Sequence, residues 1–312
     1  MWQIAVPAGH SSPVIWDTRI FLTASDSANP KELITLAIDR EAGRTLWRQV
    51  VQAETQGRFH PLNNPASSTP AVDDKHVYVY FGTYGLLCYD HAGNEVWQRR
   101  IDTPQSKYGV ATSPILYEDK VILVLDDDGG SSRLLAVHRD TGKMDTLLRI
   151  FDHDKNGIIS KEEWMQTMSG FAALSQPTLV AIRPGATKDA RRSHVAWEIK
   201  RGIPETSSLL YCRGRLYLLR DGGLLTCLRA STGTEIFRER IGASGQYIAS
   251  PIVVGDKIIV ASVPGVVTII QVDDKLNVLA RNNFGEQIFA TPALFENRIY
   301  LRTAGHLYAL GE

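Results

Sequence analysis

The sequence has no excess of charge of either sign. Among its 312 residues, 34 lysine and arginine side chains balance 34 aspartate and glutamate side chains, so the formal net charge at pH 7 is zero. Proteins drawn to nucleic acid or to an anionic membrane surface by their overall field carry a positive net charge. The balance argues against both partners, and we predict no nucleic-acid binding.

Cysteines and long apolar runs are also scarce. The three cysteines, Cys88, Cys212 and Cys227, are odd in number and widely separated, which excludes a disulfide framework and a cysteine metal site. We interpret them as small buried side chains. No window approaches the roughly 18 uninterrupted apolar residues of a transmembrane helix, so none is predicted.

Two further absences concern export and catalysis. The N-terminal MWQIAVPAGH has neither the basic region nor the long apolar core of a signal peptide. Two alternatives follow: a cytoplasmic protein, or a chain from which an export signal was removed. The sequence also contains no glycine-rich phosphate loop, HExxH, GxSxG or CxxC motif. We therefore predict no catalytic residues.

What the sequence does contain is an internal repeat of about forty residues. A Ser/Thr-Pro pair followed by two apolar runs recurs, and the β-branched and aromatic content of these runs predicts two strands. In most copies a second strand pair follows, joined by a polar turn with glycine and ending near Trp or Phe. Four antiparallel strands at this period form the blade of a β-propeller.

The spacing of the copies gives the number of blades. The repeat prolines are Pro13, Pro70, Pro114, Pro251 and Pro292, with Leu209 in the equivalent place of a sixth copy. The interval of 95 residues before Leu209 is long enough for two units, and residues 177–202 within it read as a half-blade. We count seven units, one of them irregular; a six-bladed ring with an elaborated insertion is the alternative.

The two ends of the chain complement each other. The last copy ends at Leu310 with three strands, whereas Trp2–Val6 is a strand without a blade. An open ring would leave two unpaired sheet edges. We therefore predict that residues 2–6 pair with the strand at 306–310 and complete the last blade.

Residues 151–164, FDHDKNGIISKEEW, interrupt the strand pattern with the spacing of a calcium loop. Oxygen ligands stand at loop positions 1, 3, 5, 7, 9 and 12, with glycine at position 6. The predicted Ca²⁺ ligands are Asp152, Asp154, Asn156, Ile158 through its backbone carbonyl, Ser160 and Glu163. The flanking MDTLLRIF and KEEWMQTMSGFAAL have the apolar spacing of helices. We predict an EF-hand insertion that binds Ca²⁺ with modest affinity.

A second candidate site lies in the connections that lead into the innermost strand of each blade. These connections run over the face on which propellers usually bind ligands. They supply His10, Asn64, Tyr108, Glu205, Tyr247 and Phe289 near the mouth of the central channel. Such a polar and aromatic ring could hold a peptide, a sugar or a small ligand. Solvated loop residues without a ligand are the alternative.

The unit A-x-D-x-x-x-G-x-x-x-W that ends at Trp47, with its weaker copies, resembles the quinoprotein-type repeat. This is the blade of the PQQ-dependent dehydrogenases and of non-enzymatic bacterial relatives such as the outer-membrane assembly lipoprotein. The resemblance covers nearly the whole chain and implies an all-β, PQQ-like propeller of about seven four-stranded blades. It also implies a periplasmic or extracellular location.

The resemblance has departures. Ala42 replaces the usual Thr, His138 replaces the usual Asp, and the copy at 134–143 lacks its Trp, which puts the fourth strand of the third blade in doubt. The dehydrogenases hold the quinone against an adjacent-cysteine disulfide. This chain has no Cys-Cys pair, so we do not expect PQQ as a cofactor.

Together these features predict three parts. Residues 1–143 form blades 1–3 with the closing strand, 144–175 form the EF-hand insertion, and 176–312 form the remaining blades. The predicted function is a non-catalytic binding or scaffold propeller, acting as a monomer on an unknown protein, peptide or small ligand. The alternative is an enzyme, of quinoprotein type or another, that works at the channel mouth.

Overall fold

The computed structural model describes residues 1–128, 132–144, 178–183 and 194–311. The regular elements within these ranges are 25 strands and no helix, so the described chain is all-β. The expected calcium loop at 152–163 and its flanking helices lie outside the described residues, except for Met144 at the start of the first helix, which forms a β-bridge. The described part also contains no helix with the length and hydrophobicity needed to cross a bilayer.

The chain folds into two compact units. Unit 1 comprises Met1–Ala172 and Ala293–Glu312, and unit 2 comprises Ala173–Pro292. The division of the chain at 143/144 and 175/176 stays a prediction. Among the described residues the strands form seven antiparallel sheets, which correspond one to one to the seven repeat units.

Unit 1 holds four of these sheets. The first sheet consists of β2 (Val14–Trp16), β3 (Arg19–Ser25), β4 (Glu32–Asp39) and β5 (Thr45–Gln52). The second sheet consists of β6 (Ala71–Val72), β7 (His76–Phe81), β8 (Gly85–Asp90) and β9 (Glu95–Arg100). The third sheet consists of β10 (Ile115–Tyr117), β11 (Lys120–Leu125) and β12 (Arg133–His138). The last sheet has the order β1 (Trp2–Ala5), β25 (His306–Leu310), β24 (Arg298–Arg302) and β23 (Ala293–Phe295).

Unit 2 holds the other three. Its two-stranded sheet consists of β13 (Leu179–Ile182) and β14 (Val195–Ile199). The next consists of β15 (Leu210–Cys212), β16 (Arg215–Arg220), β17 (Leu224–Arg229) and β18 (Glu235–Arg240). The last of the three consists of β19 (Ile252–Val254), β20 (Lys257–Ala261), β21 (Val266–Gln271) and β22 (Val278–Asn283).

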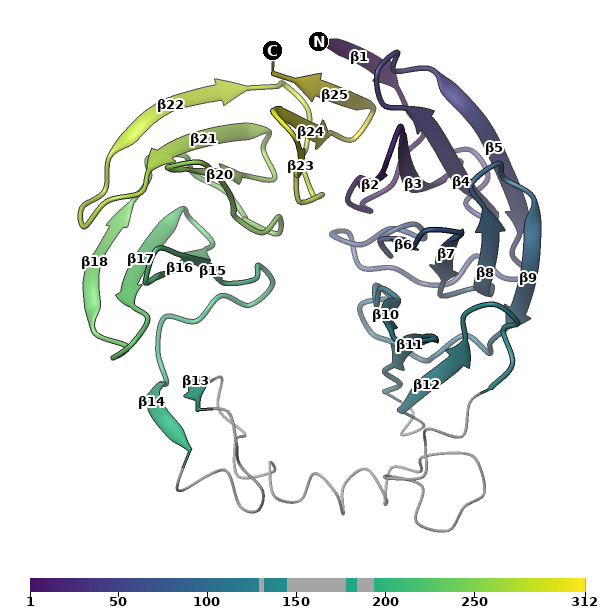
Figure 1. The fold of residues 1–312 in the computed structure, drawn as a ribbon, viewed down its shortest axis with the longest axis horizontal. Coiled ribbons are helices and arrows are strands. Elements are labelled where there is room, and N and C mark those ends of the chain that lie inside the picture. The colour runs from purple at the N-terminus through teal and green to yellow at the C-terminus, as the bar shows by residue number, and fades with distance from the viewer. Residues whose placement is uncertain (129–131, 145–177, 184–193, 312) are drawn as a thin grey trace. The chain divides into compact units, whose positions relative to one another are not determined.

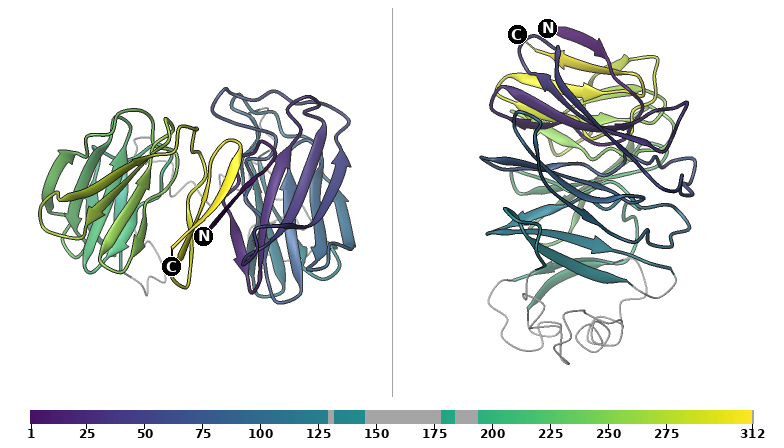
Figure 2. Two further views of the ribbon diagram at one scale, coloured as in Figure 1. Left: turned by 90° about the horizontal axis from the view of Figure 1, so that it is seen from above. Right: turned by 90° about the vertical axis from the view of Figure 1, so that its right-hand side faces the viewer.

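The two ends of the chain pair as the sequence predicts. Strand β1 runs antiparallel to β25, with Trp2 opposite Ala309 and Ala5 opposite His306. The Val6 N–H extends the pairing with a 3.0 Å hydrogen bond to the carbonyl oxygen of Gly305. The two termini accordingly lie side by side in Figure 1 and Figure 2. The N-terminal strand thus supplies the fourth strand of the last sheet.

Burial explains the strand patterns within a sheet. Strand β4 is buried on both faces, from Leu33 to Ile38, whereas the edge strand β5 contains only partly buried and exposed residues. Strand β4 therefore reads as a continuous apolar run, as expected for a strand covered on both sides. In the four-stranded sheets the buried side chains gather on the two middle strands, between the two edge strands. Figure 1 shows this order of strands within each sheet.

A tryptophan on an edge strand connects neighbouring sheets. Each indole N–H donates to a backbone carbonyl in the glycine turn of the next sheet, at 2.8–3.0 Å. The pairs are Trp2 with Arg40, Trp47 with His91, Trp97 with Arg139 and Trp197 with Ala230. The ring covers a turn glycine with positive φ, where a Cβ atom would lie within 2.8 Å of the indole; these are Gly43, Gly93, Gly142 and Gly233. The tryptophan of one sheet and the glycine turn of the next therefore form one contact between the two sheets, which we call the joint.

The third sheet and the two-stranded sheet, which are irregular, correspond to the two copies in which the sequence repeat is incomplete. The described part of the third sheet has three strands, followed by an isolated bridge between Val137 and Met144. The two-stranded sheet carries Trp197 on β14, so its strands occupy the third and fourth places of a blade. The predicted half-blade at 177–202 corresponds to this sheet.

Candidate binding site

The second sheet has two ends of different character. At one end, the long connections 53–70 and 101–114 meet the β7–β8 hairpin and residues 126–128 that follow β11; we call this the loop end. At the other end lie the tight turns that join β6 to β7 and β8 to β9, together with the corresponding turns of the third sheet; we call this the turn end. Antiparallel order places these segments at opposite ends because successive strands reverse direction.

Hydrogen bonds tie the segments of the loop end together. The carbonyl oxygen of Tyr108 accepts from the backbone N–H of His60 at 3.2 Å and from the side-chain amide of Asn63 at 2.8 Å. The Tyr108 ring also packs on the His60 ring, with centroids 5.4 Å apart. The two long connections are therefore held to each other.

The connection 101–114 is also fixed from the third sheet. The Asp127 carboxylate accepts the backbone N–H of Gln105 at 3.2 Å, and the Asp128 carboxylate accepts that of Lys107 at 2.6 Å. The Asp128 N–H in turn donates to the carbonyl oxygen of Gln105 at 2.7 Å. These carboxylates satisfy backbone donors that a loop would otherwise leave to solvent.

These segments enclose a cavity of about 480 Å³. It is lined by residues 57–59, 82–83, 103–107, 109–110 and Asp128. Three glycines allow its walls to pack closely: a Cβ on Gly57 would lie 2.7 Å from Thr83, one on Gly109 would lie 2.6 Å from Phe59, and one on Gly82 would lie 2.5 Å from Val110. The volume falls within the roughly 300–1,000 Å³ of small-ligand pockets.

The cavity carries two cationic side chains. Arg58 comes from the first connection and Lys107 from the second, and both are exposed. Within the described ranges, no carboxylate forms an ion pair with either of them. The Lys107 ammonium lies over the Tyr108 ring, 5.6 Å from its centroid. Neither residue was among the sequence-based candidates; the signal in the sequence is a basic residue near a glycine in each long connection.

The six residues predicted for the channel mouth are divided between the units. His10, Asn64 and Tyr108 lie in unit 1, and Glu205, Tyr247 and Phe289 lie in unit 2. Tyr108 is 59% exposed and stands between Lys107 and Gly109, which line the cavity, without itself belonging to the lining. Asn64 is half-buried, and its side-chain oxygen accepts the Ala66 N–H at 2.8 Å, so it shapes the connection itself.

His10 is half-buried against the first connection. Its backbone N–H donates to the Ala66 carbonyl at 3.1 Å, and its Nδ1 lies 3.5 Å from the Ser67 hydroxyl. Burial, and then the positive charge of Arg302, lower the pKa of His10 to about 4. The imidazole is therefore neutral at physiological pH.

In unit 2 the prediction for Tyr247 is wrong. Its side chain is only 1% exposed, and its hydroxyl donates to the Ala243 carbonyl at 2.8 Å. Burial raises its pKa to about 12. Tyr247 belongs to the hydrophobic core of unit 2 and offers no surface to a ligand. Glu205 is exposed and Phe289 is half-buried.

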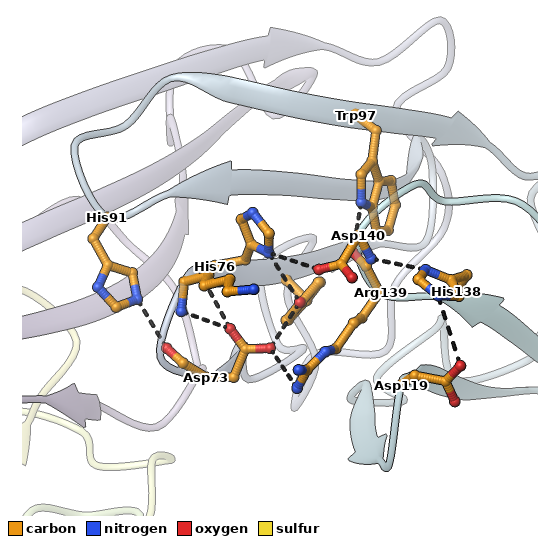
Figure 3. Close-up of polar contacts among 10 residues, drawn as sticks. Asp73, His76, His91, Trp97, Asp119, His138, Arg139 and Asp140 are labelled. Carbon is orange, nitrogen blue, oxygen red and sulfur yellow. Dashed lines mark hydrogen bonds and ion pairs between the residues drawn. The ribbon is translucent and has the colours of Figure 1, made fainter.

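The turn end holds a network of paired charges between the second and third sheets (Figure 3). Asp73, 8% exposed, accepts the N–H groups of Lys75 and His76 at 3.0 and 2.8 Å and the Tyr78 hydroxyl at 2.9 Å. Arg139 of the third sheet lies 3.2 Å from the same carboxylate. Burial opposes ionisation of Asp73, yet these donors and Arg139 hold its pKa below its usual value.

Two histidines extend this network. His76 lies 3.8 Å from the Asp140 carboxylate, and His138 lies 3.6 Å from that of Asp119. His138 stands where the repeat usually has Asp, and its Nδ1 lies 3.2 Å from the Asp140 N–H. The ring nitrogen therefore accepts the turn hydrogen bond that an Asp oxygen accepts elsewhere in the repeat, as Asp39 and Asp90 do.

The network joins sheets and has no sign of a reactive group. Among the residues that the structure describes, no cluster of three or more His, Cys, Asp or Glu side chains could hold a metal ion. The three cysteines are free and buried, as the sequence predicted. Burial raises the pKa of Cys88 and raises that of Cys227 to about 11, so both thiols are protonated at neutral pH.

Comparison with known proteins places the chain in a family. The sequence profile of the outer membrane protein assembly factor BamB matches residues 1–156 and 178–280. This chain belongs to that family. The match confirms the resemblance drawn from the repeat, and the fold is that of an all-β propeller with quinoprotein-type repeats. The comparison with curated proteins finds no match.

Solved structures include two that are similar over most of the chain. BamB from Moraxella catarrhalis shares 14% sequence identity, with 98% of this chain and 74% of that chain covered and a TM-score of 0.35. The computationally designed Ika8 protein shares 8% identity, with 96% and 71% covered and a TM-score of 0.32.

Proposed function

We propose that this protein is a non-catalytic binding propeller that holds a peptide segment of another protein at the loop end of unit 1. The main support is the cavity of about 480 Å³ between the connections 53–70 and 101–114, which are fixed to each other by hydrogen bonds. A site whose walls are already ordered loses little conformational freedom when a ligand binds. The exposed ring of Tyr108, the residue between the lining residues Lys107 and Gly109, is the type of side chain that anchors protein interfaces.

The family name supports a role in protein assembly. The family is described as an outer membrane protein assembly factor, a name that points to a role on other proteins. By this analogy the bound segments belong to outer membrane proteins, and the chain acts in the periplasm.

The test is an array of short peptides that tile outer membrane protein sequences, probed with the full chain. We expect a subset of peptides to bind the parent protein and to lose binding in Tyr108→Ala. The matched control is Tyr211→Ala, which removes a 64% exposed tyrosine from unit 2 and leaves the subset unchanged. The same peptides bound by all three proteins, or by none, would contradict the proposed site.

We also propose that residues 152–163 bind Ca²⁺, on the strength of the ligand spacing in the sequence. A single loop with three carboxylates fits the weak affinities of extracellular modules, roughly 10⁻⁴–10⁻³ M. Calcium should then raise the melting temperature with its concentration. Glu163→Gln, which removes a bidentate ligand, should abolish the rise, whereas His153→Ala should keep it. Isothermal titration without heat at millimolar calcium would refute this proposal.

A further inference from the structure

We infer that the loop-end cavity is a carboxylate site, which takes an acidic side chain of the bound peptide. This inference rests on the proposed function and adds the chemical class of the ligand. It begins with Arg58 and Lys107, which come from different connections and line the same cavity. A group bound between them would contact both connections at once.

The local charge favours an anion. Asp128 is the acidic side chain in the lining. Its carboxylate already accepts a hydrogen bond from the backbone N–H of Lys107, at 2.6 Å. The described residues provide no counter-ion to the Arg58 guanidinium or the Lys107 ammonium. At the turn end of the same sheet, by contrast, Arg139 is paired with Asp73 at 3.2 Å. The cations of the cavity are therefore available to a ligand.

The surroundings strengthen a contact with a carboxylate. Phe59, Pro104 and Val110 form apolar parts of the wall, and apolar walls raise the strength of a nearby charge pair relative to bulk water. A guanidinium binds a carboxylate through two parallel N–H···O bonds, which gives geometric selectivity as well as affinity. The hydroxyls of Thr83 and Thr103 provide further donors in the lining.

The size of the cavity favours a peptide over a free small acid. A carboxylate group fills only a small part of about 480 Å³, which leaves space for the side chain and backbone that carry it. The His60 and Tyr108 rings, tilted by 59° in contact with each other, neighbour the lining residues Phe59 and Lys107 in sequence and could receive a flanking apolar or aromatic residue. We therefore expect an acidic residue next to an aromatic one in the best ligands.

The experiment uses short acetylated and amidated peptides that differ only in a central glutamate, glutamine or lysine beside a phenylalanine. Binding to the full chain is measured by isothermal titration at low and high salt, and free glutarate serves as the small-acid probe. We expect the glutamate peptide to bind about tenfold more tightly than the glutamine peptide, with the difference shrinking at high salt. Glutarate alone should bind much more weakly.

Variants assign the preference to the two cations. Arg58→Gln and Lys107→Gln should each reduce the glutamate-to-glutamine ratio severalfold, and the double variant should remove it. Lys75→Gln, which removes an exposed positive charge at the turn end, is the matched control and should leave the ratio unchanged. Equal binding of the glutamate and glutamine peptides, or an equal effect of Lys75→Gln, would overturn the inference.

Two outcomes separate this inference from the proposed function. Equal binding of all three peptides that is lost in Tyr108→Ala would overturn the carboxylate site and leave the peptide site standing. Glutarate binding as tight as that of the glutamate peptide would overturn the peptide as the source of the carboxylate.

Discussion

The loop end and the turn end of the second sheet use charge in opposite ways. At the turn end, Asp73 is nearly buried and each recorded partner comes from the protein itself, including Arg139 of the third sheet. At the loop end, Arg58 and Lys107 are exposed and line a cavity. At the turn end the charges are paired between two sheets, whereas at the loop end no described carboxylate pairs with the two cations, which is the basis for proposing a ligand there.

The largest expected effect comes from breaking the turn end. Asp73→Ala would leave Arg139, the Tyr78 hydroxyl and two backbone N–H groups without their acceptor. We expect a loss of about 3–4 kcal/mol in the free energy of unfolding, measured by urea denaturation. Asp74→Ala, at the exposed neighbouring position, should change it by less than about 0.5 kcal/mol. Equal effects of the two variants would show that the network does not hold the sheets.

The second effect is a pH dependence that arises at the loop end. Because burial and Arg302 lower the folded-state pKa of His10 to about 4, the unfolded chain takes up this proton at higher pH than the folded chain. Stability should therefore be complete above pH 6.5 and fall as the pH drops towards about 4, by up to about 3 kcal/mol. Urea denaturation along this pH range measures the loss.

His10→Gln should flatten the profile in this window. The pKa of Asp73 is lowered, so its contribution is present above its unfolded value, near 3.9, and is lost only at lower pH. The two contributions therefore fall in separate windows. A profile that keeps its slope in His10→Gln would assign the dependence to another group.

A third effect tests the joint between the first and second sheets. Gly93 has a φ of 92° and its turn lies under Trp47, where a Cβ atom would be 2.8 Å from the indole. Gly93→Ala should cost about 2–3 kcal/mol, because backbone strain adds to displacement of the ring. Gly255 has a φ of 61° and open space where a Cβ atom would stand. Gly255→Ala should therefore lower the free energy of unfolding by only about 1 kcal/mol. Thermal melts with equal shifts would show that the tryptophan contact contributes nothing.

Much of the fold follows from patterns that are local in sequence. The turn that contains Gly43 and the tryptophan four residues later recur together, so periodicity finds both halves of the joint between sheets. The pairing of β1 with β25 was predictable because each end of the chain supplies the strand that the other lacks. These features are repeated, and repetition is visible without coordinates.

The candidate site could be predicted from the sequence only in part. Tyr247 lies in a connection and reads as a loop residue, but its burial depends on packing in unit 2, which links it to Ala243 and to the Asp221 carboxylate. The pair formed by Asp73 and Arg139 joins residues that are distant in sequence and belong to different blades. The availability of Arg58 likewise depends on which carboxylates surround it in space. Properties that depend on neighbours from other blades leave no periodic signal.

The smallest expected effect concerns the two cations of the loop end. If the cations of the loop end serve a ligand and not the fold, Arg58→Ala and Lys107→Ala should each change the free energy of unfolding by less than about 0.5 kcal/mol, since exposed charges without a partner contribute little. The contact of the Lys107 ammonium with the Tyr108 ring, 5.6 Å from the ring centroid, could raise this figure for Lys107→Ala. Urea denaturation of the two variants, beside Asp73→Ala as the large reference, measures the difference. A loss above about 1 kcal/mol in either variant would mean that the side chain ties the two connections together. The loop end would then be held by its charges as the turn end is, and the distinction between a structural end and a binding end would fail.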